Sequence, residues 1–226
     1  SKALHKEALK QLKKAKELAY KFTNFTLLLD VLIAERNIIT VLPDKNIREA
    51  RKQLYEEELA VTEKLRKSFE YSWLSDQMVI CVEQKGDFRE EDKIKEMEQI
   101  ISSPLMRTFS SANEHNMKFY YLHTHLFYNL GKNRLDEVRK LLLKEVELLE
   151  AESHFIDDNP KNYSSSLINL LLFSQMTNSR KDVRDSVIKL NALRKKLKNK
   201  VSLQLELHIL FHAANTEMLI YRNSCD

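Results

Sequence analysis

The sequence predicts an all-α protein, built as a right-handed superhelical array of about five antiparallel helix pairs. Three observations lead to this fold class. Glycine and proline fill only five of the 226 positions, which suits long helices with few special turns. Apolar residues recur at spacings of three and four along almost the whole chain. Turn-forming residues recur at intervals of 41 to 47 residues, about the length of a helix pair with its two turns.

The first five helices are expected at 3–21, 24–42, 46–67, 70–85 and 88–102. Ala8, Leu12, Ala15 and Ala19 form the apolar face of the first helix, with lysines between them. The other four segments show the same helical spacing of apolar residues. No segment of the sequence alternates as a strand would.

The last five helices are expected at 112–130, 135–156, 163–177, 181–199 and 201–222. Ser111 and Glu114 form a capping-box pattern at the start of the first of these. Asn159 and Pro160 provide a cap followed by proline at a first helical position. These signals predict where two of the helices begin.

Short polar segments mark predicted turns between helices. They are Pro43-Asp44-Lys45-Asn46, Gly86-Asp87, Gly131-Lys132-Asn133, Asn178-Ser179 and Asn223-Ser224. Glycine and asparagine tolerate the left-handed conformation that ends many helices. Gly86 and Gly131, the only two glycines, are therefore expected to form tight turns inside helix pairs.

Two of these regions resemble the tetratricopeptide repeat. The stretch QKGDFRE around Gly86 is similar to that family's inter-helix turn, and Tyr120, Thr124, Phe127 and Gly131 resemble its first-helix signature. The repeats here are longer than the usual repeat of about 34 residues. Glu91 also stands where the family has a small residue. The resemblance implies a single TPR-like α-solenoid over residues 1–226, and a generic helical solenoid is the alternative.

The phase of the repeats suggests that the chain starts and stops inside helix pairs. Each repeat of a solenoid buries its face against the next one, so the terminal repeats need polar caps. Residues 1–226 are therefore expected to be part of a longer protein, or to need a partner at one end.

The net charge of +4 is unevenly distributed. Residues 1–21 hold seven lysines against two glutamates, and residues 180–200 hold nine basic residues against two aspartates. The ordinary interpretation of each run is the solvated face of an amphipathic helix. The alternative is nucleic-acid binding by the basic helices 2–21 and 180–200, which requires strong salt dependence.

Composition also bears on the compartment. No apolar run approaches the length of a membrane span, and no signal-peptide pattern is visible at the N-terminus. Two cysteines, Cys81 and Cys225, are too few for a disulfide framework and favour a reducing compartment. A cytoplasmic protein without a membrane partner is expected.

No motif identifies a reaction, so the chain is not expected to be an enzyme. Two glycines make most nucleotide-binding loops impossible, and the sequence lacks a phosphate-binding glycine loop, Gly-x-Ser-x-Gly and His-Glu-x-x-His. His208 and His212 are one helical turn apart, but no matching carboxylate or cysteine lies on their face, so helix packing is the favoured role. Cys81 is expected to be a buried, inert thiol. No catalytic residue, metal or cofactor is predicted.

A binding surface remains. In the tetratricopeptide family the first helix of each pair lines a concave groove, and the Gly131 register places a polar and aromatic strip on that face. The strip is Tyr121, His125, Tyr128 and Asn129. The same register assigns Trp73, Asp76, Ile80 and Glu83 to the groove one repeat earlier, and Gln175 and Met176 one repeat later. The alternative is that the tyrosines pack between helices as core.

The leading functional hypothesis is a non-catalytic scaffold or sensor domain that binds a protein or peptide segment in its concave groove. Aromatic anchors would supply contact area and polar groups would fix the register of the ligand. Nucleic-acid binding is the second hypothesis, and a helical enzyme is the third.

Overall fold

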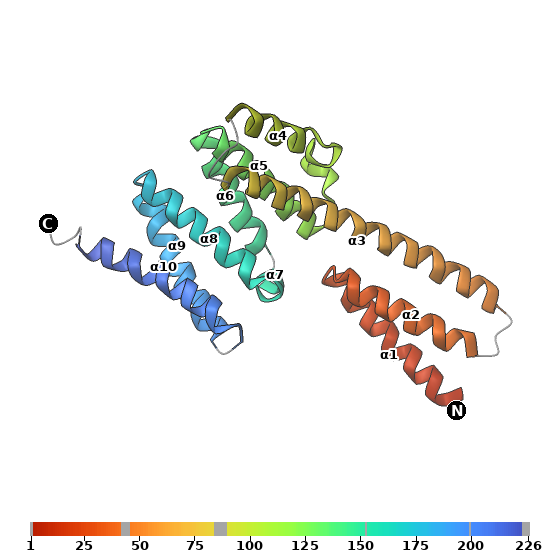
Figure 1. Ribbon diagram of the computed structural model, residues 1–226. Helices are drawn as coiled ribbons and strands as arrows, with labels where there is room; N and C mark the ends of the chain where they lie inside the picture. The colour runs from red at the N-terminus through yellow and green to blue at the C-terminus, as the bar shows by residue number, and fades with distance from the viewer. Residues whose placement is uncertain (1, 42–45, 84–89, 152, 199, 223–226) are drawn as a thin grey trace. The chain divides into compact units, whose positions relative to one another are not determined.

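The computed structural model describes residues 2–41, 46–83, 90–151, 153–198 and 200–222, and within these ranges the chain is helical without a strand (Figure 1). The helices are α1 (Lys2–Lys21), α2 (Phe25–Val41), α3 (Ile47–Glu83), α4 (Glu90–Ser102), α5 (His115–Gly131), α6 (Leu135–Glu150), α7 (Ser153–Asp158), α8 (Pro160–Met176), α9 (Arg180–Leu197) and α10 (Leu203–Arg222). Two 3-10 turns, η1 (Pro104–Met106) and η2 (Phe109–Ser111), precede α5. The all-α prediction is confirmed. The superhelical order of the pairs stays a prediction.

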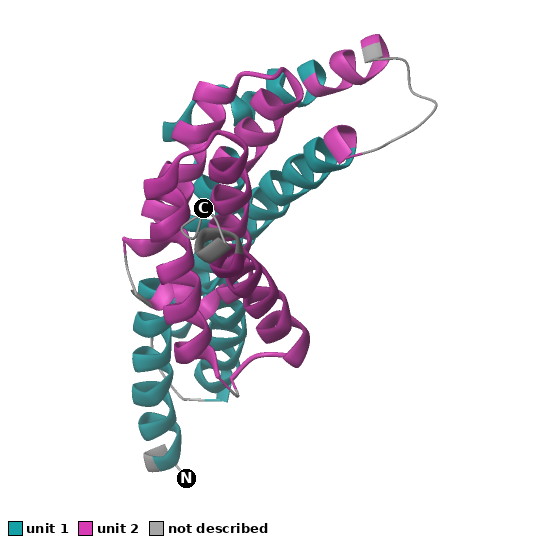
Figure 2. Cartoon of the chain, turned by 90° about the vertical axis from the view of Figure 1, so that its left-hand side faces the viewer, with its two compact units in different colours: residues 1–80, 98–121 teal, residues 81–97, 122–226 magenta. Residues whose placement is uncertain are grey.

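The chain divides into two compact units (Figure 2). Unit 1 comprises residues 1–80 and 98–121, and unit 2 comprises residues 81–97 and 122–226. Helices α3, α4 and α5 each contribute residues to both units.

Helix α3 is one unbroken helix of 37 residues, where the sequence predicted two helices at 46–67 and 70–85 (Figure 1). The predicted break at residues 68–69 is wrong. This stretch contains neither glycine nor proline, so nothing in the backbone interrupts the helix. Arg66 also bridges Glu63 and Glu70 across the position of the expected break. At 1.5 Å per residue, α3 extends about 55 Å.

Two further boundaries differ from prediction. The segment predicted as one helix over 135–156 is divided into α6 and α7 around Ala151. The capping box does not form, because Ser111 belongs to η2 and its hydroxyl pairs with that of Thr108 at 2.6 Å. Glu114 instead binds Lys64 of α3 at 2.7 Å. Helix α8 begins at Pro160 as predicted, but the side chain of Asn159 makes no capping hydrogen bond.

Three helices end in the same left-handed turn. Thr23, Asn133 and Asn178 have φ values of 49°, 56° and 55°. In each turn the residue after the left-handed one donates its amide to the carbonyl five residues earlier, as Arg134 does to Asn129 at 2.9 Å. These are Schellman motifs, which satisfy the last carbonyls of α1, α5 and α8. The turns predicted at 131–133 and 178–179 are confirmed. The break predicted between the helices at 3–21 and 24–42 is confirmed as well, but the left-handed conformation of Thr23 was not predicted, because threonine rarely adopts it.

We expect Thr23→Asn to raise the free energy of unfolding by about 1 kcal/mol. Left-handed backbone is costly for a β-branched residue and much less so for asparagine, the residue at the two matching turns. Equilibrium urea unfolding measures the change. Thr40→Asn, an exposed threonine inside α2, is the matched control and should not stabilise the protein. A loss of stability in Thr23→Asn would show that the threonine methyl group matters more than the backbone strain.

Gly131 does not play the part expected of it. It is the last residue of α5, and the left-handed residue of this turn is Asn133. A Cβ atom at Gly131 would lie 2.4 Å from Cε of Met97 and 3.3 Å from Cγ2 of Val82. A side chain at this position would therefore require the flexible end of Met97 to shift, because the helices of unit 2 approach closely here. Gly86 and the turns at 43–45, 86–87 and 223–224 lie outside the described residues.

Each unit has its own apolar core. In unit 1, α1, α2 and α3 bury one cluster of side chains: Ala19, Phe25, Leu28, Leu32, Leu54 and Val61. A second cluster of unit 1 surrounds the fully buried Tyr71 and includes Met106, Ala112 and Met117. Unit 2 buries the inward faces of α5, α6, α8, α9 and α10, including Leu126, Leu142, Leu171, Leu190 and Ile209.

None of the helices in the described ranges combines the length and apolarity needed to cross a lipid bilayer.

Candidate functional site

The outward face of α3 in unit 1 carries a row of residues spaced alternately by four and three positions. We call it the α3 stripe: Tyr55, Leu59, Thr62, Arg66, Phe69, Trp73, Asp76 and Ile80. All eight residues are exposed. The opposite face of the helix packs into unit 1 through Leu54, Val61 and Tyr71. The long helix therefore has one face in the core and one apolar face in solvent.

The aromatic pair Phe69 and Trp73 dominates the stripe. Their exposed fractions are 69% and 62%, and they lie one helical turn apart on the same face. Large aromatic side chains in solvent are unusual when they form a contiguous set, and such sets mark interaction sites. Tyr55, Leu59 and Ile80 extend the apolar surface in both directions along the helix.

The spacing of the stripe is that of a coiled-coil seam. Alternation of three and four gives a period of 3.5 residues, which keeps the row facing one partner helix over its whole length. Thr62, Arg66 and Asp76 interrupt the apolar row with polar groups. Polar residues at seam positions restrict the register and the choice of partner.

One edge of the stripe carries carboxylates at intervals of seven residues: Glu56, Glu63 and Glu70. Arg66 donates to Glu63 at 2.8 Å and also pairs with Glu70. The hydrogen bond from Arg66 holds the pKa of the Glu63 carboxyl below its usual range. Lys52 lies 3.9 Å from Glu56. Exposed pairs of this kind contribute little to stability, so a partner's cations can replace them.

Trp73, Asp76 and Ile80, which the sequence assigned to a binding groove, belong to this stripe. Tyr55, Leu59 and Phe69 were missed. Their signal was present in the sequence, because the 4-3 spacing runs without interruption from Tyr55 to Ile80. Treating 46–67 and 70–85 as separate helices concealed it.

The strip predicted on α5 is divided by the unit boundary. Tyr121 lies in unit 1, where it packs against the Tyr71 cluster and contacts the ring of Phe109 edge-on at 5.6 Å. Burial raises the pKa of the Tyr121 hydroxyl. Tyr121 is half-buried and contributes to the packing of unit 1. This agrees with the alternative interpretation, in which the tyrosines pack between helices.

The other three residues of the strip lie in unit 2. Asn129 is buried and donates its side-chain amide to the carbonyl of His125 at 2.7 Å, one turn back along α5. Tyr128 is half-buried, with Lys132 and Arg134 over its ring at 5.8 and 5.9 Å. These contacts place cations on the ring face of Tyr128. The side-chain amide of Asn129 therefore forms its hydrogen bond within α5.

The remaining predicted positions also lie in unit 2. Glu83 is exposed at the end of α3. Gln175 is half-buried and donates to the hydroxyl of Thr216 on α10 at 3.0 Å. Met176, its neighbour, is exposed. Gln175 therefore ties α8 to α10.

The most completely buried carboxylate in the described residues is Glu145 on α6. It accepts hydrogen bonds from Nδ1 of His123 on α5 at 3.0 Å and from the hydroxyl of Ser166 on α8 at 2.9 Å. A nucleophilic triad places the histidine between the serine and the acid. Here the carboxylate lies between the other two, so the histidine cannot take the serine proton. The trio joins three helices and has the geometry of a structural contact.

His208 and His212 lie with their ring centroids 4.8 Å apart on α10. Burial and the neighbouring His208 lower the pKa of His212. Among the residues the structure describes, no three histidine, cysteine or acidic side chains are grouped closely enough to hold a metal ion.

Cys81 is buried, as predicted, on the part of α3 that belongs to unit 2. Burial, followed by its hydrogen bond with Glu96, raises the pKa of the thiol from 9.0 to about 11. The thiolate is the reactive form, so we expect alkylation of Cys81 at pH 8 to be about 100-fold slower in the folded protein than in the unfolded chain. The measurement uses Cys225→Ser, which leaves Cys81 as the sole thiol. Equal rates in the two states would contradict it.

Comparison with protein-family models, with curated proteins and with solved structures found no match.

Proposed function

We propose that this chain is a non-catalytic protein-binding scaffold, and that its α3 stripe pairs with an amphipathic helix of a partner protein. The observation that carries the proposal is the exposed pair Phe69 and Trp73 within a seam of 3.5-residue period. The partner helix has an apolar seam flanked on one edge by Lys or Arg. That basic edge lies against Glu56, Glu63 and Glu70.

The chemistry of the stripe supports a helical ligand over an extended one. A seam of constant period along α3 matches another helix turn by turn, and apolar anchors at such spacings are the mark of helix recognition. Tryptophan, tyrosine and arginine are the residues most often found at binding hot spots, and the stripe contains all three. Phe69 and Trp73 supply the apolar area. Arg66, which lies between Leu59 and Phe69 along the stripe, supplies a polar contact for the partner.

Self-pairing of the stripe is disfavoured by its charges. In a parallel pair, Arg66 of one chain would lie opposite Arg66 of the other at the centre of the seam. In an antiparallel pair, the edge carrying Glu56, Glu63 and Glu70 would lie against the same edge of the second chain. Like charges at these positions oppose association. A different chain with basic residues at the matching positions removes both conflicts.

The proposal retains the TPR-like array and its groove from the sequence analysis. Trp73, Asp76 and Ile80 were assigned to the groove-lining first helix of a repeat, and they are the last three residues of the stripe. The α3 stripe extends that surface along the fused helix to Tyr55.

Two synthetic helices that differ only in charge test the proposal by isothermal titration. Both carry Leu and Ile on the seam, and their flanks carry Lys in one peptide and Glu in the other. The Lys-flanked peptide should bind at least about tenfold more tightly, because its flank complements the carboxylate edge. The triple variant Glu56→Lys/Glu63→Lys/Glu70→Lys should reverse this preference.

The matched control changes the same net charge away from the stripe. Glu7→Lys/Glu17→Lys/Glu49→Lys alters three exposed carboxylates of unit 1 and should keep the original preference. Equal binding of both peptides by the native chain, or equal effects of the two triple variants, would reject the proposed recognition.

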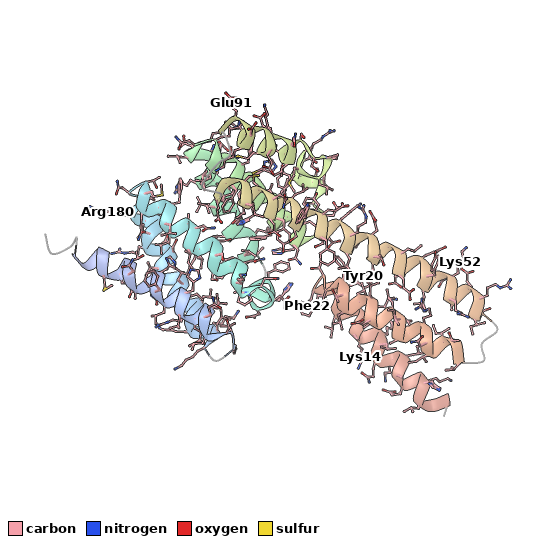
Figure 3. The ribbon with its side chains drawn as sticks, viewed as in Figure 1. Lys14, Tyr20, Phe22, Lys52, Glu91 and Arg180 are labelled. Atoms are coloured by element: carbon pink, nitrogen blue, oxygen red, sulfur yellow. The ribbon has the colours of Figure 1, made fainter. Side chains whose placement is uncertain are left out.

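Nucleic-acid binding by the basic helices is the second candidate, and one observation favours it. Lys6, Lys10, Lys13 and Lys14 are exposed on α1 and form no ion pair with the residues that the structure describes. Lys14 and Arg180, at the start of α9, both extend away from the ribbon (Figure 3). In contrast, Lys16, Lys189 and Lys196 pair with carboxylates. This candidate requires binding to single-stranded DNA that falls steeply with salt and is lost in a Lys10→Gln/Lys13→Gln/Lys14→Gln variant.

A further inference from the structure

Unit 2 contains an open cleft of about 530 Å³ between α6, α8 and α9. This volume lies within the range of small-ligand sites in proteins. Its apolar lining includes Leu143, Val146 and Leu170, which we call the apolar floor. Its walls are the facing sides of α6 and α9, and they are mostly acidic.

An ion pair bridges α6 and α9 at each end of the cleft. At one end Arg139 of α6 donates to Asp182 of α9 at 2.7 Å. At the other end Lys189 of α9 donates to Glu150 of α6 at 2.8 Å. Burial raises the pKa of Asp182, but hydrogen bonds from Arg139 and Ser179 outweigh it and hold that pKa below its usual range. The protein thus uses a basic side chain to neutralise the acidic walls at both ends.

Between these two ion pairs, the walls of the cleft carry carboxylates that are not paired with a basic side chain. Glu147 of α6 and Asp185 of α9 both line the cleft and form no ion pair with any described residue. Both side chains are exposed to solvent. The middle of the cleft therefore has two negative charges above an apolar floor.

The hydroxyl of Ser186 gives an independent indication of a ligand. Ser186 lines the cleft beside Asp185 and is 1% exposed, and its Oγ has no hydrogen-bond partner among the described residues. A buried hydroxyl normally has a partner, because leaving it unpaired costs about 1–3 kcal/mol. A hydrogen-bond donor bound in the cleft would supply that partner.

We propose that this cleft binds an organic cation with an aliphatic stem, either a Lys or Arg side chain of a peptide or a free polyamine. The ammonium or guanidinium group lies between Glu147 and Asp185 as a third bridge from α6 to α9. The stem lies on Leu143, Val146 and Leu170, as the stems of long basic side chains do on apolar surfaces. The site is separate from the α3 stripe and does not depend on it.

Titration with spermidine, and separately with a blocked tripeptide that has arginine at its centre, tests the site at constant ionic strength. Methyl resonances of Leu143, Val146 and Leu170 should shift as either probe binds. The variant Glu147→Gln/Asp185→Asn should weaken binding at least about tenfold, since it removes both charges at the centre of the cleft. Ser186→Ala should weaken it by a smaller factor.

The matched control is Asp136→Asn/Glu137→Gln, which makes the same charge change on exposed residues of α6 outside the cleft. It should bind as the native chain does. Binding of spermidine alone identifies a polyamine site, and tighter binding of the tripeptide identifies a peptide site. Equal weakening by the two double variants, or no methyl shift with either probe, would overturn the proposal.

Discussion

The double variant Phe69→Ala/Trp73→Ala is expected to weaken binding of the Lys-flanked helix by at least about 100-fold. Each side chain exposes more than half of its surface in the free protein, and a partner helix would cover both. Truncating a hot-spot aromatic residue costs about 2 kcal/mol or more, and each 1.4 kcal/mol is tenfold in affinity. Isothermal titration measures the loss.

The fold of the variant should be unaffected, because neither side chain belongs to a core cluster of unit 1. Its helical circular dichroism and its urea midpoint should match those of the native chain. Leu18→Ala/Leu27→Ala, which truncates two exposed residues of α1 and α2, is the matched control and should retain full affinity. Loss of binding in the control as well would show a non-specific apolar interaction.

Glu145→Ala is expected to lower the free energy of unfolding by about 3–5 kcal/mol. The carboxylate is fully buried and is the common acceptor of His123 and Ser166. Its removal takes this shared acceptor from both side chains inside unit 2, and breaking a buried polar contact from one side has costs of this size. Equilibrium urea unfolding, followed by helical circular dichroism, measures the change.

Two further variants serve as comparisons for Glu145→Ala. Glu145→Gln keeps an acceptor oxygen for His123 and should cost less than Glu145→Ala. Glu147→Ala, two residues along the same helix but exposed, should change stability by no more than about 0.5 kcal/mol. If Glu145→Ala were as mild as Glu147→Ala, the trio would not be a structural contact of unit 2.

Local signals in the sequence predicted most of the helices, and they failed where the signal was ambiguous. Asn133 and Asn178 lie in turns that their residue types indicate, because asparagine tolerates left-handed backbone. Thr23 forms the same turn with a residue that gives no such indication. The stretch Ser68-Phe69 has no helix breaker, and α3 continues through it where two helices were predicted.

The candidate site was only partly predictable for a related reason. Trp73 and Asp76 were identified from a repeat register, which does not show which face of a helix is covered by its neighbours. Exposure of Phe69 depends on α1 and α2 packing against the opposite face of α3, and that is a tertiary property. Tyr121 and Asn129 have the residue types of a binding strip. In the fold, Tyr121 packs against the Tyr71 cluster and Asn129 forms a hydrogen bond within α5.

Trp73 is the only tryptophan in the chain, so its fluorescence reports directly on the α3 stripe. The decisive measurement is its emission spectrum during titration with the Lys-flanked helix. In the free protein the exposed indole should emit as a solvated tryptophan. Binding should shift the emission to shorter wavelength and protect Trp73 from a soluble quencher, with the same midpoint as the calorimetric titration. A calorimetric binding signal that leaves both the emission and the quenching of Trp73 unchanged would place the partner elsewhere and contradict the account.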